Sequence, residues 1–328
     1  MKRTGNVKLS VMTWNIYLGA ELTPVFTACS AEQIPELATQ VFRQFLATNF
    51  PERAKVIANQ IDLKKPDIIG LQEAVIWKLI SPDSHMVSYD FVNILIHELR
   101  YRGLKYEVAA VNQNAQAALP SSTGNTISLS DRDVILIRDR DDMKVIKKQE
   151  ANFKNNFQIN ISKQTFTTLR GWSALDVCFQ ENVFRIVNTH LDTDSLEVQA
   201  AQANELLDGP GKTELPLIFI GDFNSNANEN ETTYANLIAA GFKDSWIEAG
   251  KNKGFTCCQD SDLLNAESSL NERIDFILLK NKKYWGAVKA EAIGQSQLDR
   301  TKTRLWPSDH AGVFVKLKLK NCKTNMQE

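Results

Sequence analysis

Leu217-Ile218-Phe219-Ile220-Gly221-Asp222-Phe223-Asn224 is an apolar run that stops abruptly at polar residues. Consecutive apolar residues without alternation are typical of a strand buried on both faces of a sheet. Gly221 permits a tight turn, and residues two apart on an extended backbone point to the same side. We therefore expect Asp222 and Asn224 to present a carboxylate and an amide to one point. That pairing suits a hydrated cation, an attacking water and a phosphoryl oxygen.

Similar runs recur along the chain and set its expected organisation. Further strands are predicted at residues 9–16, 67–71, 134–137, 173–179, 184–189, 274–279 and 312–319. Helical periodicity is present at 31–47, 51–63, 91–102, 195–207 and 232–240. No linker divides these elements, so we expect a single α/β domain over residues 1–328. Within it, 19–50 is expected to be a helical insertion, 76–90 a long connection, and Asp194 the cap of the helix that starts at Ser195.

Composition and charge limit the class of protein. The formal net charge of −1 gives no broad basic surface for nucleic acid, and residues 280–285 are the nearest basic and aromatic run. No apolar stretch is long enough to span a membrane, and the N-terminus lacks the apolar core of a signal peptide. We expect a soluble protein, cytoplasmic or secreted after removal of a signal, and no protein partner is implied.

The cysteines follow no metal-binding pattern. They are Cys29, Cys178, Cys257, Cys258 and Cys322, without a CxxC pair. We expect structural or free thiols, with a disulfide between distant cysteines as the alternative. The neighbours Cys257 and Cys258 are not expected to bridge each other, because a disulfide between them strains the intervening peptide.

Further polar clusters stand where apolar runs start or stop. They are Thr13-Trp14-Asn15, Gly70-Leu71-Gln72-Glu73, Asn188-Thr189-His190-Leu191-Asp192, Arg273-Ile274-Asp275 and Ser308-Asp309-His310. Taken singly, each has an ordinary explanation as a turn, a helix cap, an ion pair or a satisfied histidine. Polar groups at neighbouring strand ends can also converge in one cleft, which makes the set more informative than its members.

In this order, the clusters resemble the endonuclease/exonuclease/phosphatase superfamily, which includes pancreatic-type deoxyribonucleases, bacterial sphingomyelinases and inositol-polyphosphate phosphatases. Gly-Asp-x-Asn at residues 221–224 and Ser-Asp-His at 308–310 carry most of the resemblance, which extends over residues 9–319. It implies a four-layer α/β/β/α sandwich, in which two mixed sheets pack face to face between helices. It also implies a divalent-metal-dependent phosphoesterase with its site at one edge of the sandwich.

The resemblance further implies a metal site and a charged histidine. Glu73 would bind Mg²⁺ or Mn²⁺, helped by Asn15 and Asp309, because oxygen ligands suit these hard ions. His310 would face the phosphoryl group as a charged hydrogen-bonding partner or a general base, oriented by Asp275.

The remaining roles follow in the same way. Asp222 would orient or deprotonate the attacking water, and Asn224 would fix that water and a phosphoryl oxygen. His190 would bind another phosphoryl oxygen. Arg170, before a predicted strand, is a candidate phosphate clamp or a plain surface arginine. Asp131, in what is expected to be a polar loop, is a candidate partner that orients His190.

Substrate identity is the open part of this interpretation, since one fold hosts many substrates. We predict a nuclease-like phosphodiesterase that uses in-line attack of an activated water. The alternatives are a phospholipid or sphingomyelin phosphodiesterase and an inositol-phosphate phosphatase. A catalytically inactive binding module is a further alternative, although every expected site position is filled.

Overall fold

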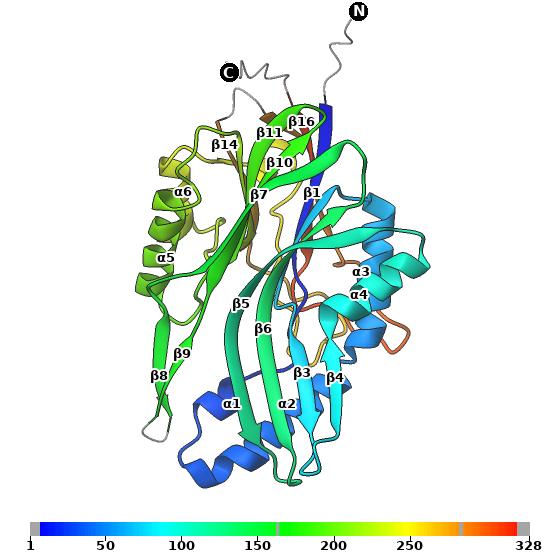
Figure 1. Cartoon of the computed structure of the whole chain (residues 1–328), viewed down its shortest axis with the longest axis vertical. Helices are drawn as coiled ribbons and strands as arrows, with labels where there is room; N and C mark the ends of the chain where they lie inside the picture. Colours follow the sequence, from blue (N-terminus) through cyan, green and yellow to red (C-terminus); the bar gives the residue numbers. More distant parts are fainter. Residues whose placement is uncertain (1–6, 162–163, 282–284, 320–328) are drawn as a thin grey trace, which may run out of the picture.

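The computed structural model describes residues 7–161, 164–281 and 285–319. Cys322 and residues 282–284 of the basic and aromatic run lie outside these ranges. Two large mixed sheets are flanked by helices, as the resemblance implied (Figure 1). A short hairpin adds a third sheet.

The eight-stranded sheet has the order β15-β16-β1-β2-β6-β3-β4, with β5 paired to β6. Its strands are β1 (Val7–Asn15), β2 (Ile68–Gln72), β3 (Ile76–Ile80), β4 (Met86–Asp90), β5 (Tyr106–Pro120), β6 (Thr126–Arg138), β15 (Trp285–Ile293) and β16 (Gly312–Leu319). The six-stranded sheet has the order β13-β14-β12-β11-β10-β7. Its strands are β7 (Met143–Asn152), β10 (Gly171–Phe179), β11 (Asn182–His190), β12 (Leu217–Asp222), β13 (Lys243–Asp244) and β14 (Asp275–Lys280). The hairpin consists of β8 (Phe157–Ile161) and β9 (Gln164–Thr168).

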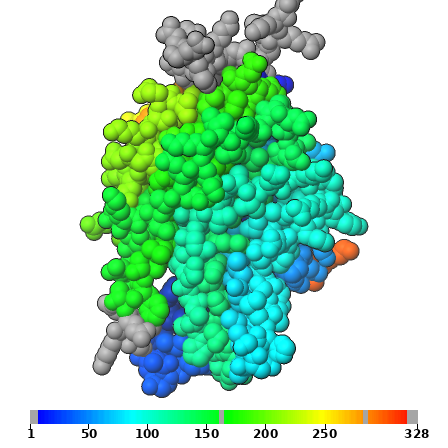
Figure 2. All heavy atoms as spheres, viewed as in Figure 1, coloured from blue at the N-terminus to red at the C-terminus, as the bar shows by residue number. Residues whose placement is uncertain are grey.

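Helices pack against both sheets. They are α1 (Thr23–Phe26), α2 (Ile34–Ala47), α3 (Phe50–Lys64), α4 (Phe91–Tyr101), α5 (Leu196–Asp208), α6 (Thr232–Ala239) and α7 (Ser245–Ala249), with 3₁₀ turns η1 (Ala31–Gln33) and η3 (Gln297–Asp299). Apolar residues of α2, α3 and α4 pack on the eight-stranded sheet, and those of α5 and α6 pack on the six-stranded sheet. The insertion that contains α1 and α2 lies at one end of the molecule, drawn in blue in Figure 2.

The core between the two sheets explains the uninterrupted apolar runs. In β12, Ile218 and Ile220 face the inner core, whereas Leu217 and Phe219 face the helices, and all four are fully buried. Side chains on both faces of such a strand must be apolar, so alternation disappears. The strands buried in this way are also the ones whose ends carry the polar clusters.

Four expectations from the sequence are wrong in detail. Residues 76–90 form the hairpin β3–β4 rather than a long connection. Asp131 lies within β6 rather than in a loop, because β6 continues well beyond its apolar part. Ser195, not Asp194, caps α5, since its side chain accepts a hydrogen bond from the Val198 amide. Asn224 is not extended: it has a φ of +49° and follows the end of β12.

The cysteine prediction is also partly wrong. The structure joins the neighbours Cys257 and Cys258 in a disulfide, and the peptide bond between them is cis, with Cα atoms 3.1 Å apart. The expectation assumed the ordinary trans geometry. Cys29 and Cys178 are free thiols, as expected.

Candidate active site

Strand register places three of the candidate residues in one row. His190 is paired with Asp222 across the parallel strands β11 and β12, and Asp222 is paired with Asp275 across β12 and β14. In the other sheet, Asn15 at the end of β1 is paired with Gln72 at the end of β2, directly before Glu73. The site therefore forms where strand ends from both sheets meet.

His310 is held by a buried carboxylate. Its Nδ1 donates to Asp275 Oδ2 at 2.9 Å, and its Nε2 lies 3.8 Å from Asp222 Oδ2. Burial by itself lowers the pKa of His310, but the charges of Asp275, Asp222 and Asp309 raise it well above the ordinary value. The imidazole is therefore held in its charged form.

His190 has the opposite preference. Its Nδ1 lies 2.8 Å from Arg170 Nη1, and because a guanidinium can only donate, Nδ1 must accept. The ring proton is then on Nε2, which lies 3.5 Å from Asp222 Oδ2. Burial first, and then the charges of Arg170 and His310, lower the pKa of His190 well below its usual value. This imidazole is neutral.

Asp222 lies between these two rings. One carboxylate oxygen, Oδ2, accepts a hydrogen bond from Asn15 Nδ2 at 3.1 Å, and the other, Oδ1, accepts from the Asn224 amide at 3.0 Å. Burial, and then repulsion by Asp275, raise the pKa of Asp222 to about 6. The Asn224 side chain donates to the Leu191 carbonyl at 2.9 Å, which ties the end of β12 to the residue after β11.

The oxygen ligands expected for a metal lie beside Asp222. Asn15 Nδ2 also donates to Glu73 Oε1 at 3.1 Å, and its Oδ1 accepts from the Tyr17 amide at 3.0 Å. Asn15 thus bridges two carboxylates through its amide nitrogen. Burial, followed by the charge of Asp131, raises the pKa of Glu73, and burial raises that of Asp309 to about 7.

These carboxylates fit a divalent cation. Burial and neighbouring negative charge raise the pKa of both acids, and a bound cation offsets both causes. Carboxylate and amide oxygens are the ligands preferred by Mg²⁺ and Mn²⁺. A second group, Asp222, Asp275 and His310, has one donor atom from each residue within 4.8 Å of the others.

The family is shown by a model of the endonuclease/exonuclease/phosphatase family, which matches residues 12–310. The chain belongs to this family. Its members are hydrolases of phosphoester bonds that generally use divalent metals. A search of curated proteins found no match.

Solved structures show the endonuclease/exonuclease/phosphatase fold at low sequence identity. A family protein from Bacteroides thetaiotaomicron is 15% identical, with a TM-score of 0.61 and 99% of each chain covered. D. rerio TDP2, complexed with a single-strand DNA product, is 17% identical, with a TM-score of 0.59 and coverage of 94% of this chain and 98% of that chain. A mannosyl-6-phosphatase from Bacteroides thetaiotaomicron VPI-5482 is 16% identical, with a TM-score of 0.57 and coverage of 94% and 99%.

An acidic pair, Asp131 and Asp133, lies behind His190, and sequence reasoning named Asp131 but missed Asp133. Asp131 reaches His190 only through Arg170, whose Nη1 lies 3.4 Å from Asp131 Oδ2. Asp133 comes closer, with Oδ1 4.0 Å from His190 Nδ1, and Asn114 Nδ2 donates to both carboxylates. Burial, and then the charge of Asp131, raise the pKa of Asp133 well above its usual value. The spacing of Asp131 and Asp133, two apart on one face of a strand, was the available signal.

Two buried hydroxyls hold the loops of this family site together. Ser308 Oγ donates to the Asn15 carbonyl at 2.7 Å and accepts from the His310 amide at 3.2 Å. Thr256 Oγ1 accepts from the Asp275 amide at 3.2 Å, while its carbonyl accepts from the Ala311 amide at 2.7 Å. Thr256 therefore links the strand that carries Asp275 to the residue after His310. No sequence pattern marks Thr256.

Proposed function

We propose that the chain is a divalent-metal-dependent phosphodiesterase in which Asp222 activates the attacking water. The position of Asp222 carries this proposal, because its carboxylate lies between a charged imidazole, His310, and a neutral one, His190. A base is most effective when its pKa is near the working pH. With a pKa raised to about 6, Asp222 is a stronger base than an ordinary carboxylate and is still ionised at neutral pH.

The two histidines would bind the phosphoryl group from the same side. His310, kept charged by Asp275, offers Nε2–H to one phosphoryl oxygen, and His190 offers Nε2–H to another. Donors fixed in place before the reaction stabilise the charge that develops in the transition state. Asn224 would hold the water beside Asp222, and Arg170 would keep His190 in the tautomer that donates.

Glu73 and Asp309 would hold Mg²⁺ or Mn²⁺, with Asn15 beside them. The bound ion would neutralise negative charge on the phosphoryl oxygens. Asn15 also donates to Asp222, so it would fix the position of the carboxylate that activates the water relative to the metal ligands.

The test is hydrolysis of chromogenic esters by the purified protein. We expect bis(p-nitrophenyl) phosphate to be hydrolysed with Mg²⁺ or Mn²⁺ and not with excess EDTA. Glu73→Gln and Asp222→Asn should lose the activity, whereas Glu107→Gln, at an exposed position of β5, should keep it. Turnover by Asp222→Asn equal to that of the wild type would remove Asp222 from its proposed role, and no metal-dependent turnover would favour an inactive binding module.

Two neighbours justify additional substrates in the assay. The TDP2 structure holds a single-strand DNA product, so a single-stranded oligonucleotide tests nuclease activity. The mannosyl-6-phosphatase justifies p-nitrophenyl phosphate as a monoester. Faster turnover of the monoester than of the diester would replace the phosphodiesterase proposal by a phosphatase.

A further inference from the structure

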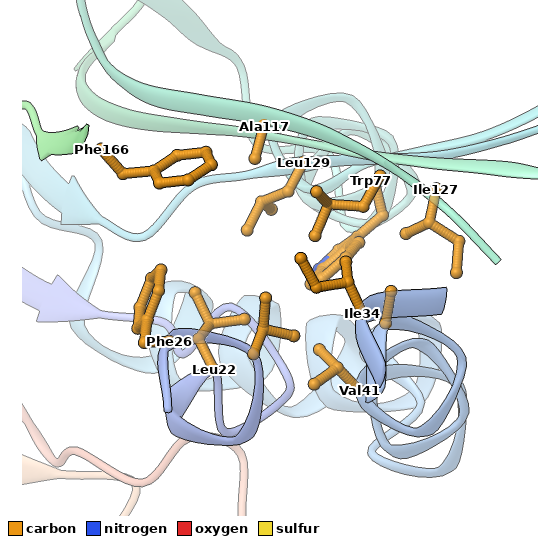
Figure 3. Close-up of a pocket in the computed structure, with 12 residues that line it drawn as sticks. Leu22, Phe26, Ile34, Val41, Trp77, Ala117, Ile127, Leu129 and Phe166 are labelled. Carbon is orange, nitrogen blue, oxygen red and sulfur yellow. The ribbon is translucent and has the colours of Figure 1, made fainter. Parts of the chain in front are cut away.

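An apolar cavity lies between the insertion, residues 19–50, and three strands. It is lined by Ala117 and Leu119 of β5, Ile127 and Leu129 of β6, and Phe166 of β9. Its volume is about 80 Å³, and it opens to solvent on one side. Its walls include Phe26, Val41, Trp77, Leu129 and Phe166 (Figure 3), and Val25 also lines it. The only polar side-chain atom among the lining residues is Trp77 Nε1, and it already donates to the Leu18 carbonyl at 2.8 Å.

One face of β6 carries residues of the active site and, further along the strand, residues that line the cavity. Every second residue of a strand lies on the same face, and on one face of β6 these residues are Ile127, Leu129, Asp131 and Asp133. Residues two apart on a strand are about 7 Å apart. The same face of β6 is therefore acidic at Asp131, on the side of His190, and apolar at Leu129, in the cavity, only two residues away.

The partner strand β5 repeats this change. Asn112 is paired with Asp133 at the polar end, and Ala117 is paired with Leu129 at the apolar end. Asn112 and Asp133 are buried beside the active site. Both strands of the hairpin thus change, at the same level, from polar side chains beside the active site to apolar side chains at the cavity.

Two other segments connect the active site to the cavity. The Leu18 amide donates to Glu73 Oε2 at 2.7 Å, and Leu22, four residues further on, lines the cavity. Phe166 lines the cavity four residues before Arg170, which contacts His190. Because three separate segments run from one site to the other, a molecule bound at Glu73 and His190 has the cavity beside it.

The mouth of the cavity is itself apolar and open. Phe26 is 36% exposed, Ala117 is exposed and Phe166 is half-buried, whereas Val25 and Trp77 are buried at the floor. In Figure 3, Phe26 and Phe166 lie opposite each other at one side of the cavity. An open apolar hollow of this kind beside a polar site marks a place where an apolar group binds.

We propose that the cavity is a substrate subsite that receives an alkyl or acyl chain carried by the phosphoester, an inference that rests on the proposed phosphodiesterase function. The walls offer no hydrogen bond, so a nucleobase there would leave its ring nitrogens and carbonyls without partners. An aliphatic chain has no such groups. The charged ester would remain at Glu73 and His310 while the chain extends along the apolar half of β5 and β6.

A series of alkyl p-nitrophenyl phosphodiesters, from methyl to octyl, tests this subsite. We expect kcat/KM to rise by about three- to fourfold per added methylene until the cavity is filled. Ala117→Trp, which places a ring in the mouth, should flatten this dependence while the methyl ester is still hydrolysed. Ala118→Trp is the matched control, because the next residue of β5 points to the opposite face; it should keep the wild-type dependence.

Binding without turnover gives a second measurement. Calorimetry on the metal-free protein should show tighter binding of decyl phosphate than of ethyl phosphate in the wild type and in Ala118→Trp, but not in Ala117→Trp. If the wild type hydrolyses the methyl ester but kcat/KM does not depend on chain length, the subsite proposal is wrong and the proposed phosphodiesterase function still holds. No hydrolysis of the methyl ester would instead overturn the phosphodiesterase. If the wild type cleaves an oligonucleotide faster than the octyl ester, and Ala117→Trp cleaves that oligonucleotide as fast as the wild type does, the substrate is a nucleic acid and the cavity does not bind it.

Discussion

Two imidazoles flank the Asp222 carboxylate, and their surroundings favour different protonation states. His310 faces Asp275, Asp222 and Asp309, whereas His190 accepts a hydrogen bond from a guanidinium. At pH 7.5 in the metal-free protein, we expect His310 to carry protons on both nitrogens and His190 to carry one, on Nε2. Long-range ¹⁵N–¹H correlation spectra of the imidazoles measure this directly. Two rings that titrate together near pH 6.5 would contradict the assignment.

Asp275 is the residue through which His310 keeps its charge and orientation. Asp275→Asn should lower the pKa of His310, because a neutral amide replaces the charge that raises it most. Activity should fall by a factor of about 100 or more, as for the loss of one positioned catalytic group. The measurement is kcat for the diester together with the His310 titration, and Asp262→Asn, at an exposed position, is the control.

The pairing also predicts how two substitutions combine. Asp275→Asn and His310→Ala should together cost little more than His310→Ala alone, since Asp275 acts through the ring that His310→Ala removes. A double variant that loses the product of the two separate factors would show that the two residues act independently.

Helix α3 stabilises the edge of the site through one fully buried side chain. Arg53 donates to the carbonyls of Ile16 and Pro307 through Nη1, at 2.8 and 3.0 Å, and to those of Tyr17 and Thr48 through Nη2 and Nε. The carbonyls of Ile16 and Tyr17 follow Asn15, that of Pro307 precedes Ser308, and that of Thr48 lies at the end of α2. One guanidinium therefore fixes the two segments that carry metal-site residues.

Arg53→Met should lower the free energy of unfolding by at least about 3 kcal/mol, because each buried carbonyl left without a donor costs about 1–3 kcal/mol. Denaturant unfolding measures the change. Lys55→Met, at an exposed position of the same helix, is the control and should change stability by less than about 0.5 kcal/mol. Equal stabilities of the two variants would mean that water replaces Arg53 without cost.

Elements differ in how well the sequence predicted them, and burial explains the difference. β1, β2 and β12 are buried on both faces and appear as apolar runs that end in the polar clusters. β5 and β7 are among the strands that the sequence did not predict, as are β3, β4, β8, β9, β13 and β15. β5 carries Asn112 and Asn114 toward the site, so its apolar run is limited to residues 108–111, and β7 is an edge strand with exposed charges and no long apolar run. The roles of Asp133 and Thr256 depend on contacts between distant segments, which no local pattern records.

The molecule as a whole places its site across two sheets. Asn15 and Glu73 extend from the eight-stranded sheet, and His190, Asp222 and Asp275 belong to the six-stranded sheet. The inner faces of both sheets share one apolar cluster. We therefore expect the sheets to unfold together in a single transition, and a ligand that binds residues of both sheets to stabilise the whole fold. No helix in the described ranges is long and apolar enough to cross a membrane.

Metal binding should therefore raise the unfolding temperature. An ion that binds only the folded state adds about 2.7 kcal/mol of stability at a concentration one hundred times its Kd. Burial raises the pKa of Glu73 and of Asp309 in the metal-free protein, the charges of Asp131 and of Glu73 respectively add to this, and a bound cation offsets these effects. Scanning calorimetry with increasing Mg²⁺ or Mn²⁺ should show a concentration-dependent rise in Tm for the wild type and for Glu107→Gln.

Glu73→Gln should lose most of the rise while its metal-free Tm stays close to or above that of the wild type, because a neutral amide removes one of the repelling charges. A rise in Tm that Glu73→Gln fully retains would place the cation elsewhere, since the bound ion would then not need the Glu73 carboxylate.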